Sequence, residues 1–157
     1  MIDKLVRWYD VVMSRGFDKL RSPLLLVLRL MFGWELFQTG KGKLENIDRF
    51  TEFLAHLHIP MPGVSAHFVA SLECVGGLLL LLGLAARLIA IPLTINFIVA
   101  YVTADHDALV GFFRDQDAFT SAAPFLYLLV SLIILAFGPG LFSLDELIRR
   151  LWKRRSA

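Results

Sequence analysis

The sequence predicts an all-α fold: a polytopic membrane four-helix bundle with amphipathic interfacial helices at both termini. Three observations lead to this class. The chain of 157 residues is 57% hydrophobic and 19% charged, with a mean hydropathy of +0.65, whereas a soluble domain of this size normally carries more charge. Windows of low charge recur along the chain, and basic residues gather at its two ends. Because the windows take up about half of the chain, we expect a single membrane domain over residues 1–157.

Four windows of low charge stand out, and they cover approximately residues 22–40, 65–85, 88–104 and 119–137. Each is about 17–21 residues long, which at a helical rise of about 1.5 Å per residue spans or nearly spans a hydrocarbon core of about 30 Å. We therefore expect four transmembrane helices.

The residues before the first window predict a short amphipathic helix. Over residues 2–13 the apolar side chains share one helical face and the charged ones lie elsewhere, as in helices that rest on a membrane surface. Several charges precede the first window, a pattern unlike that of a cleaved signal peptide. The first transmembrane helix is expected to start at Ser22-Pro23, because a proline in the first helical turn costs no hydrogen bond.

The first two windows each present a face that combines glycines with a charge. Glycines along one stripe let a second helix approach closely, so we expect the two faces to pack together. The face of the first window contains Arg29, Gly33, Phe37 and Gly40. The face of the second window contains Glu73, Gly76, Gly77, Leu80 and Gly83, and it continues beyond the window to Arg87.

A carboxylate inside an apolar segment needs a partner or a proton, and the predicted partner of Glu73 is Arg29. In antiparallel helices Arg29 would lie about 16 Å and Glu73 about 12 Å below the outer end, from the helical rise. The pair has two interpretations, a structural ion pair that fixes helix register or a site for binding or proton transfer. Asn96, on one stripe with Pro92, is a candidate to bond either residue or to hold helices together.

Between the first two windows, residues 46–59 predict a helix that lies in the plane of the outer surface and ends before Pro60. His56, His58 and His67 surround this turn. Their spacing matches no common ligand pattern, so we predict no metal site.

The distribution of Lys and Arg predicts the orientation. Residues 1–21 and residues 149–155 each carry five basic residues, and Arg87 lies between the second and third windows. Residues 105–117 carry only Arg114 beside four aspartates. By the positive-inside rule, we expect both termini and the Arg87 turn on the cytoplasmic side of the cell inner membrane.

The C-terminal segment predicts a second interfacial helix. Gly138-Pro139-Gly140 ends the fourth window, and Ser143 to Glu146 form a capping box that starts a helix. Its apolar face and its basic residues suit anionic lipid of the inner leaflet. An arm that binds nucleic acid would lack the apolar face, so membrane lipid is the predicted partner and nucleic acid is not.

Three motifs in this order resemble the DoxX family of small four-helix membrane proteins. They are Arg29-Leu30-x-x-Gly33-x-x-x-Phe37-x-x-Gly40-x-x-Lys43, Glu73-x-x-Gly76-Gly77-x-x-Leu80-x-x-Gly83-x-x-x-Arg87-x-x-Ala90, and Gly138-Pro139-Gly140-x-x-Ser143-Leu144-Asp145. The resemblance implies a four-span bundle in the bacterial or archaeal cytoplasmic membrane. The family takes its name from a subunit of a thiosulfate:quinone oxidoreductase, and some members are linked to membrane oxidoreductase assemblies.

Two functions remain open from the sequence. In the first, the protein is the membrane subunit of a quinone-linked oxidoreductase complex, in which polar side chains between the helices hold or protonate a quinone headgroup. The candidate ligand-binding residues are Arg29, Glu73, Lys43, Gln38, Asn96 and Tyr101.

The chain has one cysteine, Cys74, and no flavin, haem or iron–sulfur motif, so electrons would have to come from a redox partner subunit. The alternative is a non-enzymatic lipid-binding or scaffold membrane protein, whose buried charges serve only the fold. A second copy of the chain is a further candidate partner.

Overall fold

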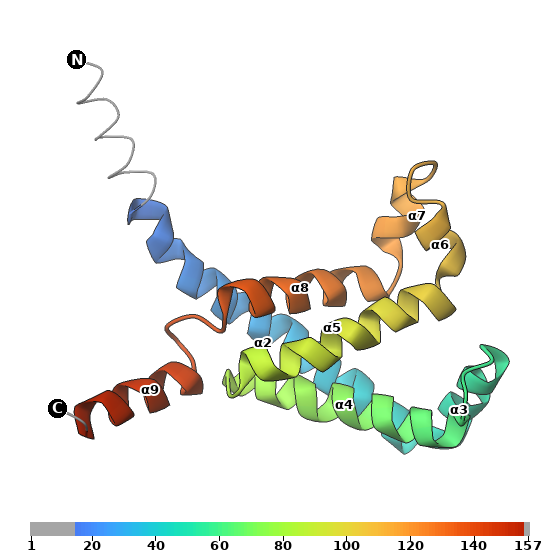
Figure 1. Cartoon of the computed structure of the whole chain (residues 1–157), viewed down its shortest axis with the longest axis horizontal. Helices are drawn as coiled ribbons and strands as arrows, with labels where there is room; N and C mark the ends of the chain where they lie inside the picture. Colours follow the sequence, from blue (N-terminus) through green and yellow to red (C-terminus); the bar gives the residue numbers. More distant parts are fainter. Residues whose placement is uncertain (1–14, 156–157) are drawn as a thin grey trace, which may run out of the picture.

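The computed structural model describes residues 15–155, with side chains from Leu20 to Arg154, and this part of the chain folds entirely into helices and their connections (Figure 1). In chain order the helices are α2 (Arg15–Glu45), α3 (Ile47–His56), α4 (Pro62–Leu82), α5 (Ala86–Thr103), α6 (His106–Val110), α7 (Gln116–Ser121), α8 (Pro124–Phe137) and α9 (Leu144–Arg155).

The most extensive helix contact joins α2 to α4, and glycines set its register. A Cβ on Gly77 would overlap the backbone of Phe37 and lie 2.7 Å from the carbonyl oxygen of Gly33. A Cβ on Gly40 would overlap the backbone nitrogen of Cys74. Backbones can approach this closely only where no side chain intervenes. Since Gly33 faces Gly77 and Gly40 faces Cys74, the two helices run antiparallel.

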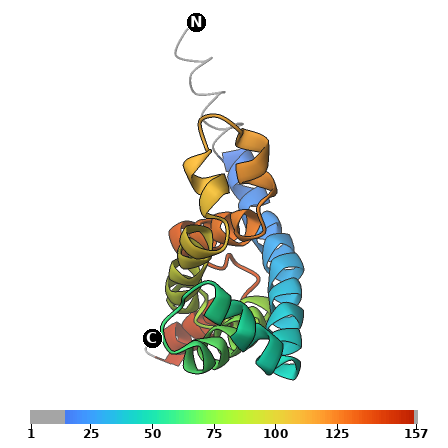
Figure 2. The ribbon, with the colours of Figure 1, turned by 90° about the vertical axis from the view of Figure 1, so that its right-hand side faces the viewer.

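A second helix pair is formed by α5 and α8, and it joins the first pair mainly through α4 and α5. The rings of Phe97 in α5 and Tyr127 in α8 stack with centroids 5.3 Å apart. Figure 2 shows α2 along one side of the molecule and α5 along the other. Residues from all four helices form the buried core, which consists of Leu36, Leu80, Ala86, Ala90, Leu93, Phe97, Val130 and Ile134.

The outward surfaces of these helices are apolar. Helices α4 and α5 are each long and apolar enough to cross a membrane, and α8 is apolar but only 14 residues long. Exposed apolar side chains lie along α2, α4, α5 and α8, and an apolar surface of this extent is unusual on a monomeric soluble protein. Examples are Leu24, Met31, Trp34, Leu78, Leu88, Ile95, Leu126 and Leu132.

The predicted boundaries of the first helix are wrong at both ends. Helix α2 already includes Arg15, so Pro23 lies in the helix interior instead of its first turn. At the other end α2 continues past Gly40 to Glu45. The polar residues after Gly40 kept the predicted window short, although residues 41–45 contain no proline and can continue the helix.

The fourth apolar window, residues 119–137, does not form one helix. Helix α7 ends at Ser121, Ala122 adopts an extended conformation with φ −61° and ψ 138°, and α8 begins at Pro124. Proline has no backbone N–H to donate, so it is favoured in the first turn of a helix over its interior. The window is therefore split between α7 and α8.

Three other predicted helices have different outcomes. A helix forms within residues 46–59 as expected, α3 (Ile47–His56), and its Leu54 is buried against the rest of the protein. The amphipathic helix expected over residues 2–13 lies outside the described residues. Helix α9 follows Ser143, whose Oγ accepts a hydrogen bond from the Glu146 backbone nitrogen at 3.2 Å.

Candidate functional site

Glu73 is enclosed between three helices, and only 3% of its surface is exposed. Lys43 Nζ donates hydrogen bonds to both carboxylate oxygens, at 2.7 and 2.6 Å. Asn96 Nδ2 donates to Oε1 at 3.3 Å. We call Lys43 of α2, Glu73 of α4 and Asn96 of α5 the carboxylate site.

Helix packing explains how three distant residues meet there. Gly40 lies against Cys74, and Lys43 follows Gly40 by about one helical turn. The Lys43 side chain therefore lies within reach of Glu73. Gly76 allows Leu93 of α5 to approach, with a Cβ at Gly76 lying 3.1 Å from the Leu93 side chain. This close packing brings Asn96 to the carboxylate. A buried carboxylate is stabilised when a cation and further hydrogen bonds satisfy its oxygens.

The predicted partnership between Arg29 and Glu73 is wrong. Arg29 lies at the other end of α4, where its Nη2 donates to the Phe142 carbonyl oxygen at 2.5 Å. Its guanidinium lies against Gly83, which closes α4 with a φ of 64°. Within residues 15–155, Arg29 Nε and Nη1 have no hydrogen-bond partner, although the residue is only 1% exposed.

The physical reason is the register of α2 and α4. The prediction aligned two apolar windows by their ends and took Gly40 as the end of the first. In the structure Gly40 faces the backbone of Glu73 and Cys74. Arg29 precedes Gly40 by three helical turns, which places it about 16 Å from that level along the helix.

Two other candidate ligand residues lie away from Glu73. Gln38 is exposed on α2. The Tyr101 hydroxyl donates to the Phe119 carbonyl oxygen at 2.7 Å, and the two rings stack with centroids 5.0 Å apart. Tyr101 therefore joins α5 to α7 and does not reach the carboxylate site.

Sequence reasoning did not include Tyr127 among the candidate site residues. Its hydroxyl lies close to Glu35 and Thr39 of α2, and it also interacts electrostatically with Glu73. Two features of the sequence indicated this contact weakly. Glu35 and Thr39 are one helical turn apart and so share a face, and Tyr127 is one of few polar residues in the last apolar window. All four major helices thus contribute polar groups to this region.

A groove of about 350 Å³ lies beside Lys43, between the end of α2 and the start of α3. Lys43 Nζ lies 4.9 Å from the centre of the Phe50 ring, and the Lys43 side chain is 27% exposed. We call this the Lys43 groove. Most of the surface that lines it is apolar, although cationic and amide side chains contribute; the lining residues are Thr39, Gly42, Lys43, Asn46, Arg49, Phe50 and Phe53.

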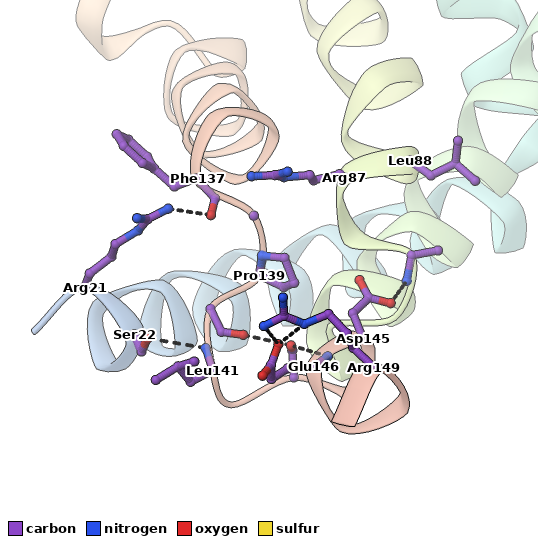
Figure 3. Close-up of a pocket in the computed structure, with 14 residues that line it drawn as sticks. Arg21, Ser22, Arg87, Leu88, Phe137, Pro139, Leu141, Asp145, Glu146 and Arg149 are labelled. Atoms are coloured by element: carbon purple, nitrogen blue, oxygen red, sulfur yellow. Dashed lines mark hydrogen bonds and ion pairs between the residues drawn. The ribbon is translucent and has the colours of Figure 1, made fainter. Parts of the chain in front are cut away.

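A larger cavity, of about 760 Å³, lies at the opposite end of the helices (Figure 3). We call it the arginine cavity, because Arg21 of α2, Arg87 of α5 and Arg149 of α9 line it. Arg21 Nη2 donates to the Phe137 carbonyl oxygen at 2.7 Å, and Arg87 Nη2 donates to that of Ala136 at 3.2 Å. The two arginines therefore cap the last turn of α8, where cations are favoured.

Two carboxylates also line the arginine cavity. Asp145 accepts hydrogen bonds from the backbone nitrogens of Ala85 and Ala86, at 2.7 and 3.1 Å, at the start of α5. Glu146 accepts from Arg149 and Arg150, both at 2.8 Å. The hydrogen bonds from Arg150 and Arg149 hold the pKa of the Glu146 carboxyl below its usual value.

Among the residues that the structure describes, no three His, Cys, Asp or Glu side chains are arranged to hold a metal ion.

Comparison with known proteins points to one family. The model of the DoxX family matches residues 24–106. An uncharacterized membrane protein of Mycobacterium tuberculosis is 34% identical over 142 residues, covering 86% of this chain and 85% of that protein. An uncharacterized protein of Haemophilus influenzae is 29% identical over 136 residues, with coverage of 84% and 87%.

A third relative carries a functional name. The Bacillus subtilis protein named "Putative oxidoreductase CatD" is 27% identical over 125 residues, which cover 78% of this chain and 85% of that protein. No solved structure gave a significant match.

Proposed function

Because the chain belongs to the DoxX family of membrane proteins, we propose that α2, α4, α5 and α8 form one four-span bundle in the cytoplasmic membrane. Helices α4 and α5 are long and apolar enough to cross by themselves. For α2 and α8 the support is their antiparallel packing against α4 and α5 and their apolar outward surfaces. The short α8 would reach across with a locally thinned bilayer or with help from its flanking segments.

The proposed orientation places the arginine cavity and both termini in the cytoplasm. Arg21, Arg87 and the basic residues of α9 then follow the positive-inside rule. A reporter that is active only outside the cytoplasm tests this when fused after Asp107 and after Ala157. Activity is expected at the first position only, and activity at the C-terminal fusion would refute the orientation.

We further propose that the protein is the membrane subunit of a quinone-linked oxidoreductase complex. The observation that carries this proposal is the buried carboxylate site with the open Lys43 groove beside it. A quinone headgroup needs a donor at its carbonyl oxygen and an apolar surface for its ring. Lys43 Nζ supplies the donor and Phe50 supplies an aromatic face.

The carboxylate site also has the groups that proton transfer requires. Reduction of a quinone to a quinol takes two electrons and two protons. The electrons would come from the redox partner subunit, because the chain has no flavin, haem or iron–sulfur motif. Lys43 contacts both the groove and Glu73, so it would deliver a proton to the quinone oxygen and recover one through Glu73 or water.

The name of the Bacillus subtilis relative is consistent with an oxidoreductase role. Purification in mild detergent, followed by solvent extraction and mass spectrometry, tests quinone binding. We expect close to one quinone per bundle from the wild-type protein. Phospholipid without quinone would refute the quinone proposal and favour the alternative, a lipid-binding or scaffold protein.

One observation favours that alternative. Glu73 itself lines neither the Lys43 groove nor the arginine cavity, and its oxygens are already bonded within the protein. In a scaffold protein the carboxylate site would only fix the register of three helices. The extraction experiment separates the two functions, because a scaffold has no need of a quinone.

A further inference from the structure

The arginine cavity contains two arginines whose charge is not neutralised by any carboxylate in the described part of the chain. Arg21 and Arg87 donate to carbonyl oxygens of α8, and neither forms an ion pair with the side chains that the structure describes. Each guanidinium has five N–H groups, so each keeps several donors beyond the one that it uses. These two residues enter the cavity from different helices, α2 and α5.

The two carboxylates that line the cavity bind groups other than Arg21 and Arg87. Asp145 accepts two backbone N–H groups of α5 and also attracts Arg29 behind it. Glu146 is held by two arginines of α9. Neither carboxylate therefore cancels the charge of Arg21 and Arg87, and the cavity has a surplus of positive charge.

Apolar side chains surround this charge and are themselves exposed. Leu88 is 70% exposed, and Phe137 and Leu141 are more than half exposed, although all three line the cavity. Figure 3 shows Leu88 and Phe137 on either side of Arg87. A site for a small hydrophilic anion gains nothing from such a rim. An amphiphile with an anionic head and an apolar body would use both parts.

We propose that the arginine cavity binds the phosphate-bearing headgroup of an anionic phospholipid. Arg21 and Arg87 hold the phosphate oxygens, and Leu88, Phe137 and Leu141 receive the start of the acyl chains. Arginine suits this role because its planar guanidinium donates two parallel hydrogen bonds to a phosphate. Basic pockets between membrane helices on the cytoplasmic side are typical sites for such headgroups.

The adjacent α9 favours a lipid over free phosphate as the occupant. Its apolar side chains Leu147, Ile148, Leu151 and Trp152 are each at least half exposed, and basic residues lie on the same helix. A helix of this composition rests on a lipid surface. The proposal rests on the membrane placement proposed above, and it is independent of the quinone proposal.

The test measures lipid binding to the full-length protein in detergent, by native mass spectrometry and by thermal stabilisation. The probes are phosphatidylglycerol, phosphatidylcholine and inorganic phosphate. The variant is R21Q/R87Q, in which glutamine stays polar and loses the charge. The matched control is R114Q, because Arg114 is an exposed arginine in the loop before α7.

We expect the wild-type protein and R114Q to prefer phosphatidylglycerol over phosphatidylcholine. Each arginine should contribute about fivefold in affinity, so R21Q/R87Q should bind phosphatidylglycerol about twenty-five-fold more weakly. If the double variant does not fold, the single variants R21Q and R87Q should each show the fivefold loss.

Unchanged phosphatidylglycerol binding in the variants would overturn the proposal. Stabilisation by inorganic phosphate equal to that by phosphatidylglycerol would also overturn it, since the site would then take free phosphate. Quinone content, measured on the same samples, should be the same in all variants. Loss of lipid preference with retained quinone therefore separates this proposal from the function of the carboxylate site.

Discussion

The two ends of the long helices differ in how far their buried and half-buried charges are neutralised by other groups of the protein. At the carboxylate site Glu73 is fully bonded, since Lys43 and Asn96 satisfy both of its oxygens. At the other end Arg29 is as deeply buried, yet two of its three nitrogens have no hydrogen bond within residues 15–155. One end neutralises its charges internally, and the other retains positive charge.

This difference shows what each end is suited to do. A closed set of hydrogen bonds fixes helix register and gives a proton a defined path. An end with surplus positive charge attracts anions from outside the protein. Substitutions at the two ends should therefore affect the stability of the protein unequally.

The largest effect is expected from Gly40→Ala. The added Cβ would overlap the backbone of Cys74, so α2 and α4 must separate and Lys43 must move away from Glu73. The free energy of unfolding should fall by about 3 kcal/mol, as for severe overpacking. Gly42→Ala is the matched control, because a Cβ at Gly42 meets nothing within 4 Å. Equal stability of the two variants in denaturant titrations would contradict the glycine register.

Removal of the Glu73 charge should have the second largest effect. Glu73→Gln leaves Lys43 without its carboxylate, but Lys43 is partly exposed and can turn toward water. We expect a loss of about 2 kcal/mol, below the usual cost of breaking a fully buried pair. The control is Glu45→Gln, which breaks an exposed pair with Lys41 and should cost less than about 1 kcal/mol. An unchanged melting temperature for Glu73→Gln would show that the pair does not stabilise the fold.

Arg29→Met should cost less than Glu73→Gln. Methionine fills a similar space, and the change removes a buried charge to which residues 15–155 supply one hydrogen bond. The cost of the lost bond to Phe142 is partly offset by the removed desolvation penalty, so we expect a net loss of about 1 kcal/mol. A larger loss than that of Glu73→Gln, in the same denaturant series, would mean that the hydrogen bond of Arg29 to Phe142 and its attraction to Asp145 stabilise the fold more than the Glu73 pair does.

The smallest effect concerns pH and Glu146. Hydrogen bonds from Arg150 and Arg149 lower its pKa from the ordinary value of 4.5. A carboxyl with a lowered pKa contributes stability above its unfolded pKa and loses it as pH falls through the folded pKa. The contacts at the start of α9 should therefore persist from pH 7 to about pH 4.5 and weaken below it.

The fluorescence of Trp152 in α9 measures this change in a chain whose other two tryptophans, Trp8 and Trp34, are replaced by Phe. Glu146→Gln should remove the acid transition. A transition already complete above pH 5 would contradict the lowered pKa.

The helical class and the family could be predicted from the sequence, because both depend on local patterns. Apolar windows indicate helices whatever their partners are, and the resemblance to the DoxX family is confirmed. The break at Pro124 was also readable, since proline is favoured in the first turn of a helix. It was missed because the apolar composition continues across it.

The partner of Glu73 could not be predicted from the ends of the apolar windows. Register depends on which backbones touch, and Gly40 against Cys74 decides it. Had the two glycine stripes been aligned with each other, Lys43 and not Arg29 would have come level with Glu73. The arginine cavity forms because the segment from Gly138 to Asp145 folds back against the turn between α4 and α5. There the Asp145 backbone nitrogen donates to the Gly83 carbonyl oxygen at 3.0 Å. Helical periodicity carries no information on such a contact.

The proposed function depends on Lys43 holding a quinone, and binding of a short-chain quinone to two neutralised pairs tests it most directly. K43Q/E73Q removes the charges of the carboxylate site without leaving a buried ion, and K41Q/E45Q does the same to the exposed pair nearby. Equilibrium titration should show about tenfold weaker binding for K43Q/E73Q, the cost of one charge-assisted hydrogen bond, and wild-type binding for K41Q/E45Q. Equal affinities in all three proteins would contradict a quinone site at Lys43.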